Sequence, residues 1–195
     1  MDLLPLVGAS GLASGINAYV VIVTLGLLGR FGGVDSVPEV LQSPLVLAIA
    51  GAMVVVEFVA DKVPYVDSLW DGISTVIRPA VGAALGYLLA DEAGSESQVA
   101  WAILGGGSAL AAHSVKTGTR LAVNASPEPV SNIVLSVGED VSVLTVVLLA
   151  VNYPWLALAI AVALFLAGAV VVVALFRLVR RGWRRRRERR NAAPV

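Results

Sequence analysis

The chain contains no cysteine, which excludes disulfide bonds, thiolate metal sites and cysteine nucleophiles. It holds a single histidine and lacks the His-Glu-x-x-His zinc motif, the Gly-x-Ser-x-Gly nucleophile elbow and the Walker phosphate-binding loop. These absences disfavour an enzyme, and the sequence predicts no cofactor.

Charge is also scarce. Asp, Glu, Lys and Arg make up 14% of the 195 residues, against about 25% in a soluble domain, and 57% of the residues are hydrophobic. This composition indicates an integral membrane protein of one domain, whose first partner is the lipid bilayer.

Six apolar segments are each near the ~20 residues that cross a bilayer core. They run from about 3–31, 44–63, 69–90, 98–123, 130–151 and 154–178. The first half of the first segment, Gly8 to Gly15, is made of small and polar residues, which predicts a broken or re-entrant helix. The expected fold class is therefore all-α, a polytopic transmembrane helix bundle of about six spans.

Basic residues are concentrated at one end. Nine of the 14 lie between Arg177 and Arg190, and the positive-inside rule places that tail in the cytoplasm. Six crossings of the cell (inner) membrane would place the N-terminus on the same side. We expect residues 1–178 to form the transmembrane domain and 179–195 a partly disordered tail at the anionic leaflet. No cleaved signal peptide is expected, because residues 1–5 carry no basic residue.

A short pattern of small residues occurs twice. Gly8–Ala13 (GASGLA) is echoed by residues 106–111 (GGSALA), near the start of a second half. Glycine-interrupted segments in corresponding places predict an inverted repeat, with halves of about 1–95 and 98–178. Equally, small residues are common wherever membrane helices pack closely, so the echo has a second interpretation.

Carboxylates lie within and beside the second and third segments. A charge in hydrocarbon costs about 3 kcal/mol, so such residues face a protein interior or a water-filled cavity. Glu57 and Asp61 share a helix face, and Asp71 follows after Pro64. We predict a site that binds a cation or relays protons. The alternative is that the charges lie at a membrane end, where they cap helices and pair with Lys62; for Asp67 a capping role is favoured.

Basic residues form an opposing face in the fourth segment. His113, Lys116 and Arg120 are spaced by three and four, which places them on one side of a helix, and Arg78 is the basic residue of the third segment. This face would hold a phosphate or another anion, or pair with the carboxylates. His113 is expected to be a hydrogen-bonded interior residue rather than a metal ligand, and the pattern identifies no metal.

A proline-broken polar stretch and two adjacent carboxylates complete the set. We predict a polar hairpin that carries Asn124, Ser126, Glu128, Ser131 and Asn132. Glu139 and Asp140 follow in the fifth segment, and neighbours on a helix point in different directions. One is expected to face an ion site and the other to pair with a cation such as Arg120.

Two patterns carry a family resemblance. They are Glu57-Phe58-x-x-Asp61-Lys62-x-Pro64-x-x-Asp67-x-x-Trp70-Asp71 with Arg78-Pro79-x-x-Gly82-Ala83, and Ser126-Pro127-Glu128-Pro129-x-Ser131-Asn132 with Ser136-x-x-Glu139-Asp140. From roughly Leu4 to Val173 the chain resembles the bacterial membrane family catalogued as domain of unknown function 4126. The resemblance implies a membrane architecture and supplies no mechanism.

Three functional hypotheses follow from these residues. The first is a small transporter or channel with a buried acidic site for a cation or proton and an opposing basic face. The second is a protein that binds, translocates or modifies a phosphate-bearing lipid. The third is a structural or regulatory membrane protein whose charges only fix helix pairing. Expected partners are a small ion, an anionic small molecule or a lipid, and a second copy in a homodimer, but no specific nucleic acid.

Overall fold

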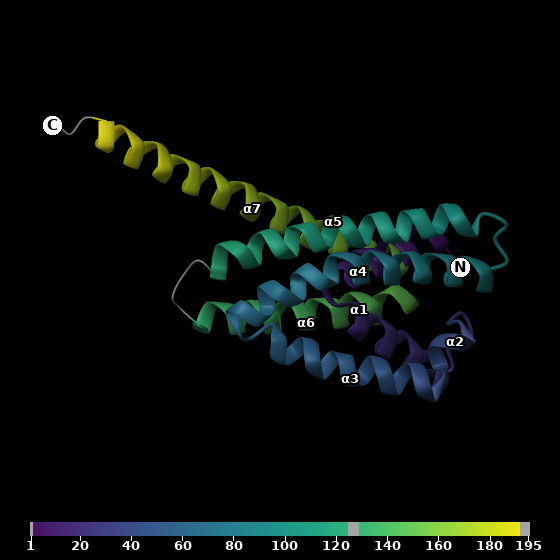
Figure 1. Ribbon diagram of the computed structural model, residues 1–195. Helices are drawn as coiled ribbons and strands as arrows, with labels where there is room; N and C mark the ends of the chain where they lie inside the picture. The colour runs from purple at the N-terminus through teal and green to yellow at the C-terminus, as the bar shows by residue number, and fades with distance from the viewer. Residues whose placement is uncertain (1, 125–128, 192–195) are drawn as a thin grey trace.

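The computed structural model describes residues 2–124 and 129–191, without the side chains of 64–65, 122, 124, 129–132, 179 and 182–191. Within these ranges the chain is all-helical (Figure 1). The helices are α1 (Leu3–Gly32), α2 (Glu39–Gln42), α3 (Pro44–Ala60), α4 (Pro64–Glu92), α5 (Gln98–Asn124), α6 (Pro129–Asn152) and α7 (Pro154–Asn191). Proline opens α3 and α4, as its fixed φ and missing N–H favour. The expected helix bundle is confirmed.

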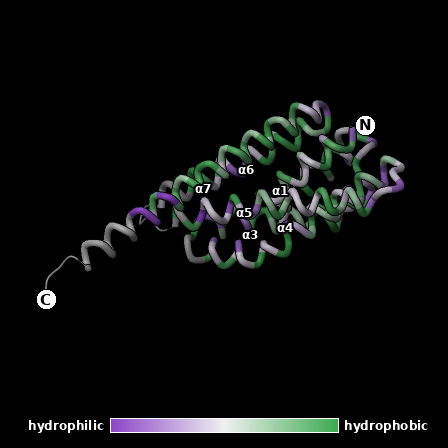
Figure 2. The backbone as a smooth tube through the Cα atoms, turned by 90° about the horizontal axis from the view of Figure 1, so that it is seen from above, coloured by the Kyte–Doolittle hydropathy of each residue, from purple (hydrophilic) through white to green (hydrophobic). Residues whose placement is uncertain are grey.

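Four helical stretches among the described residues are long and apolar enough to cross a membrane: Leu3–Gly32, Val66–Glu92, Ile133–Asn152 and Pro154–Leu178. The shorter α3 is also apolar. Hydrophobic residues cover most of α6 and the adjoining part of α7 in Figure 2. Large apolar side chains point outward, with Val76 74%, Ile103 70% and Val170 69% exposed. Such a surface is suited to acyl chains, and the protein is a membrane protein.

α1 is broken at Asn17, whose φ of −147° and ψ of 97° are not helical. The Asn17 Oδ1 accepts a hydrogen bond from the backbone N–H of Val20 at 3.1 Å, so Asn17 is the N-cap of a second arm. The first arm lies against the start of α7, where the Trp155 Nε1 donates to Asp2. The second arm returns to α2, where Gly26 lies against the carbonyl of Leu41. The expected broken or re-entrant first segment is therefore present.

This fold-back changes the position of the N-terminus. Figure 1 shows the N-terminus and the end of α7 at opposite ends of the bundle. Six crossings would place both ends on one side. The two ends lie apart because α1 enters the bundle and returns to the end at which it entered. The later helices then run along the length of the bundle.

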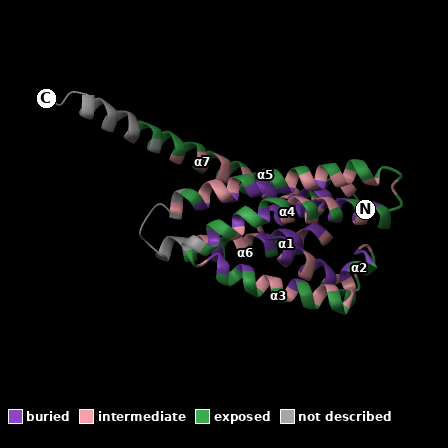
Figure 3. Ribbon diagram, viewed as in Figure 1, coloured by how far each residue is buried: buried purple, intermediate pink, exposed green. Residues whose placement is uncertain are grey.

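The buried core surrounds α1 (Figure 3). α4 packs tightly on α5 because glycines line their contact: a Cβ on Gly105 would overlap the Gly82 carbonyl, and one on Gly86 would overlap the Trp101 carbonyl. Glycine allows this backbone approach. The twice-occurring small residues also touch each other, since a Cβ on Gly11 would lie 3.0 Å from the Cβ of Ser108. Close packing accounts for that echo, and the inverted repeat stays a prediction.

The apolar, span-length part of α7 runs from Pro154 to Leu178, the end expected for the last span. The helix itself continues to Asn191, beyond the bundle (Figure 1).

Candidate functional site

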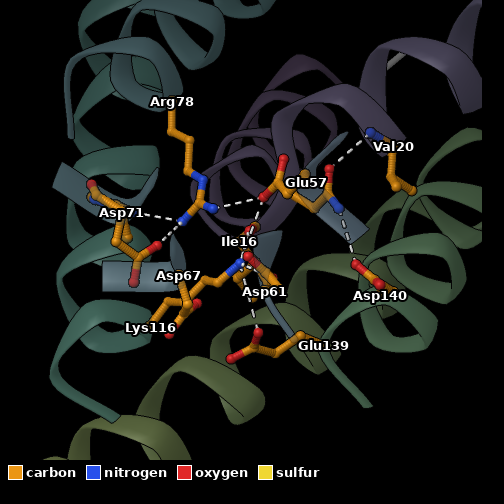
Figure 4. Close-up of polar contacts among 12 residues, drawn as sticks. Ile16, Val20, Glu57, Asp61, Asp67, Asp71, Arg78, Lys116, Glu139 and Asp140 are labelled. Carbon is orange, nitrogen blue, oxygen red and sulfur yellow. Dashed lines mark hydrogen bonds and ion pairs between the residues drawn. The ribbon is translucent and has the colours of Figure 1, made fainter. Parts of the chain in front are cut away.

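Ionisable side chains from four helices meet in one buried network (Figure 4). It joins, through ion pairs, Glu57, Asp61, Asp67, Asp71, Arg78, Lys116, Arg120 and Glu139. The sequence predicts an acidic site and an opposing basic face. In the structure these acidic and basic residues alternate within one network. Each cation lies between carboxylates that come from different helices.

Arg78 holds the α4 side of the network. Its Nη2 donates to the Glu57 Oε1 at 2.6 Å, and its Nη1 lies 3.3 Å from the Asp71 Oδ1. The same Nη1 donates to the Nδ1 of His113 at 2.7 Å. Because a guanidinium can only donate, this ring nitrogen accepts, and the His113 proton is on Nε2.

His113 is fixed by its second nitrogen as well. The Nε2 lies 3.2 Å from the backbone oxygen of Asp71 and 3.0 Å from the Thr75 hydroxyl. The imidazole is therefore a neutral bridge between α4 and α5 with both nitrogens in hydrogen bonds. This is the interior role that the sequence predicted for it.

Lys116 occupies the centre of the network. Its Nζ lies 2.8 Å from the Asp61 Oδ2, 3.5 Å from the Glu57 Oε1 and 3.7 Å from the Glu139 Oε2. It also donates to the backbone oxygen of Ile16 at 3.1 Å. That carbonyl lies at the break in α1, where the helical hydrogen-bond pattern is interrupted. A lysine of α5 therefore satisfies the backbone at the tip of the re-entrant segment.

Arg120 joins the network to α6. Its Nη2 lies 2.5 Å from the Glu139 Oε2 and 3.2 Å from the Asp61 Oδ2, and its Nη1 lies 3.7 Å from the Asp67 Oδ1. The pairing of one α6 carboxylate with Arg120 is the one expected from the sequence. The neighbouring Asp140 points elsewhere and accepts from the Asn17 amide at 2.9 Å.

The network has more carboxylates than cations. Five acidic side chains face three basic ones, a formal excess of two negative charges among the residues described. Seven of the eight side chains are at most 2% exposed, and Glu139 is the exception at 13%. The Glu57 Oε2 and the Asp71 Oδ2 are buried with no hydrogen-bond partner in the described part of the chain. Burying an unbalanced charge is costly, so this excess requires an explanation.

The sequence does not identify the roles of two residues at this site, Asp67 and Asn17. Asp67 was assigned a capping role, but the N-cap of α4 is Val63, and Asp67 is fully buried beside Arg120. Asn17 supplies both the cap and the Asp140 contact. The one available signal is an Asn in a segment of small and apolar residues.

Two further predictions concern Lys62 and the polar hairpin. Lys62, the alternative partner for a carboxylate, instead donates to the Phe58 carbonyl at 2.8 Å and covers the Phe58 ring. The polar hairpin lies outside the described side chains; its residues are Asn124, Ser126, Glu128, Ser131 and Asn132.

A cavity of about 440 Å³ adjoins the network between the first arm of α1 and helices α5, α6 and α7. Its wall is mostly apolar. The charged residues that line it are Lys116 and Glu139. The network and the cavity therefore share one boundary.

Comparison with known proteins gives one match. The family model described as "Domain of unknown function (DUF4126)" matches residues 4–174. No curated protein and no solved structure matches the chain.

Proposed function

The chain belongs to the DUF4126 family, and we propose that it is a small membrane transporter whose buried charge network binds and releases protons. The observation that carries the proposal is the excess of two carboxylates in a buried network that borders a cavity. Buried acidic residues in membrane segments characterise proton pathways.

Protons fit this network better than metal ions. A metal ion requires several oxygen or nitrogen ligands turned toward one point. Here each carboxylate lies within ion-pair distance of a lysine or an arginine, and the described residues include no group of three His, Cys, Asp or Glu side chains suited to a metal. Two protons on the network would balance its formal charge. Glu57 is the first candidate, since its Oε2 is buried and has no hydrogen-bond partner among the described residues.

The charge excess and the broken helix both support transport over a purely structural role. Ion pairs that only fix helix packing do not require an unbalanced charge, because such a charge lowers stability. The Ile16 carbonyl, at an interrupted helix, is bound by Lys116. Interrupted helices deep in membrane proteins are found where backbone groups line a binding site.

The phosphate-lipid hypothesis receives less support. Arg78, Lys116 and Arg120 are each already paired with carboxylates. An anionic headgroup would have to displace these partners in a site whose formal charge is already negative.

The orientation of the transporter follows from the basic tail. We place that tail in the cytoplasm by the positive-inside rule, in the cell membrane. The junction of α3 and α4, which carries Asp61, then lies toward the cytoplasmic side, because Figure 1 shows it at the end of the bundle from which α7 projects. The N-terminus, at the other end, is then external.

Infrared difference spectra of the purified full-length chain test proton binding. At neutral pH we expect the carbonyl band of protonated carboxylic acid, which disappears as alkali removes the proton. The band should be weaker in Glu57→Gln and unchanged in Glu39→Gln, a control at an exposed position. A wild-type spectrum without the band at neutral pH would contradict the proposal.

Proton flux tests the transport step. Proteoliposomes that contain a pH-sensitive dye should respond to a proton gradient with wild-type protein and not with folded Glu57→Gln, and Glu39→Gln is again the control. Flux that persists in Glu57→Gln would remove Glu57 from the pathway.

A further inference from the structure

The cavity has the size and the wall of a ligand site. Its volume of about 440 Å³ falls within the range of about 300–1,000 Å³ typical of small-molecule pockets. Apolar side chains from all four surrounding helices form the wall; among them are Leu12, Val115, Val143, Val146, Leu164 and Phe165. An apolar wall with few charged groups selects a ligand with a large apolar body.

The cavity reaches the lipid-facing surface. Val134 on α6 and Val171 on α7 both line it, and they are 66% and 46% exposed. These faces belong to the helices that are apolar enough to span a membrane. A ligand can therefore enter from the bilayer, without crossing water.

Of the two charged residues that line the cavity, Glu139 is the one that a ligand can reach. The Lys116 Nζ is held by the Ile16 carbonyl and the Asp61 carboxylate, and its side chain is 2% exposed. The Glu139 side chain is 13% exposed. Its Oε2 is engaged by Arg120 and Lys116, and among the described residues the hydrogen bond to this carboxylate goes to Oε2 and not to Oε1. What the cavity offers a ligand is therefore a carboxylate oxygen.

The surrounding charges favour a positive ligand. Arg120 and Lys116 face Glu139 from α5, Asp61 lies behind them at the end of α3, and Asp140 is its neighbour on α6. α7 contributes apolar residues and Gly168 to the wall, and the first arm of α1 contributes apolar residues. Since the network as a whole has two negative charges in excess, a cation at Oε1 reduces the imbalance and an anion increases it.

We propose that the cavity binds a lipophilic cation, with its apolar body against α5, α6 and α7 and its positive charge at the Glu139 Oε1. This names the substrate class of the transporter and rests on the proposed function. Charge balances if each monovalent cation that binds replaces one proton of the network. Glu139 is the residue that belongs to both the cavity wall and the network.

Two probes of matched shape test the charge preference: tetraphenylphosphonium and tetraphenylborate, titrated calorimetrically into the full-length protein in detergent. We expect binding of the phosphonium and not of the borate. Glu139→Gln should weaken phosphonium binding at least about tenfold, or about 1.4 kcal/mol. Asp140→Asn, at the adjacent carboxylate that does not line the cavity, should leave it unchanged.

A second pair of variants tests the location without altering a charge. Leu164→Trp fills the cavity and should weaken phosphonium binding, whereas Leu166→Trp, an exposed position on the same helix outside the cavity, should not. Equal binding of both probes, binding of neither, or phosphonium binding that both Glu139→Gln and Leu164→Trp leave intact would each overturn the inference. If the carboxylic-acid band is present while phosphonium binding is absent, only this inference fails and the proton-binding proposal stands.

Discussion

The two sides of α5 differ in how closely they meet their neighbours. Toward α4, glycines bring the backbones together, and Arg78 and His113 form hydrogen bonds across the contact. Toward α6 and α7, the same helix borders the 440 Å³ cavity, and the one partly exposed carboxylate of the network faces it. α5 is thus closely packed against α4 on one side and borders a cavity on the other. Lys116 and Arg120 lie between these two sides.

The largest effect on stability is expected on the closely packed side. Arg78→Met leaves Glu57 and Asp71 without their guanidinium and His113 without its donor. Removal of one partner from a buried ion pair costs about 3–5 kcal/mol. Chemical unfolding in detergent should show this loss, and the exposed Arg30→Met should lie within about 0.5 kcal/mol of wild type. Equal stability of the two variants would show that this contact with α4 does not stabilise the protein.

A smaller effect is expected from the glycine contact itself. A Cβ at Gly105 overlaps the Gly82 carbonyl, so Gly105→Ala should cost about 1–3 kcal/mol through overpacking. Gly107, on the same helix, has no atom within 4 Å of a built Cβ. Gly107→Ala should therefore be neutral, or gain up to about 1 kcal/mol of helix propensity. The thermal midpoints of the pair measure the difference, and a loss in both variants would point to a general intolerance of α5.

The smallest effect is expected on the cavity side. Glu139→Gln removes one negative charge from a network with an excess of them, and Arg120 keeps its contacts with Asp61. Loss of an ion pair and relief of the excess oppose each other, so we expect a change within about 1 kcal/mol. A destabilisation as large as that of Arg78→Met would show that the two sides of α5 are equally structural.

The sequence predicts the helices well because apolar length and proline position are local properties. Pro44, Pro129 and Pro154 lie at the starts of helices, within one residue of the expected boundaries. Apolar length and proline position need no knowledge of which helices are neighbours. The pairing of Glu139 with Arg120 is also the one expected, because few basic residues lie in the apolar segments.

Other features depend on distant contacts. A break in α1 is predictable from the small residues Gly8 to Gly15, but its position at Asn17 and the return of the second arm depend on packing against other helices. Asp67 was assigned a cap because α4 was expected to begin near Leu69, whereas it begins at Pro64 and places Asp67 one turn inside. The net charge of zero hides the charge excess, because the basic tail offsets it, but the chain before Arg177 is acidic and so indicates the sign of the excess. Which of these carboxylates share one network depends on distant contacts.

The tip of α1 has a consequence for biogenesis. The Ile16 carbonyl is satisfied by Lys116, 100 residues later, and Asn17 reaches Asp140, 123 residues later. A ribosome delivers α1 well before either partner, and domains assemble from the N-terminal side during synthesis. The re-entrant hairpin can therefore take its final shape only after α5 and α6 have entered the bilayer. The segment that is translated ahead of the others is completed after them.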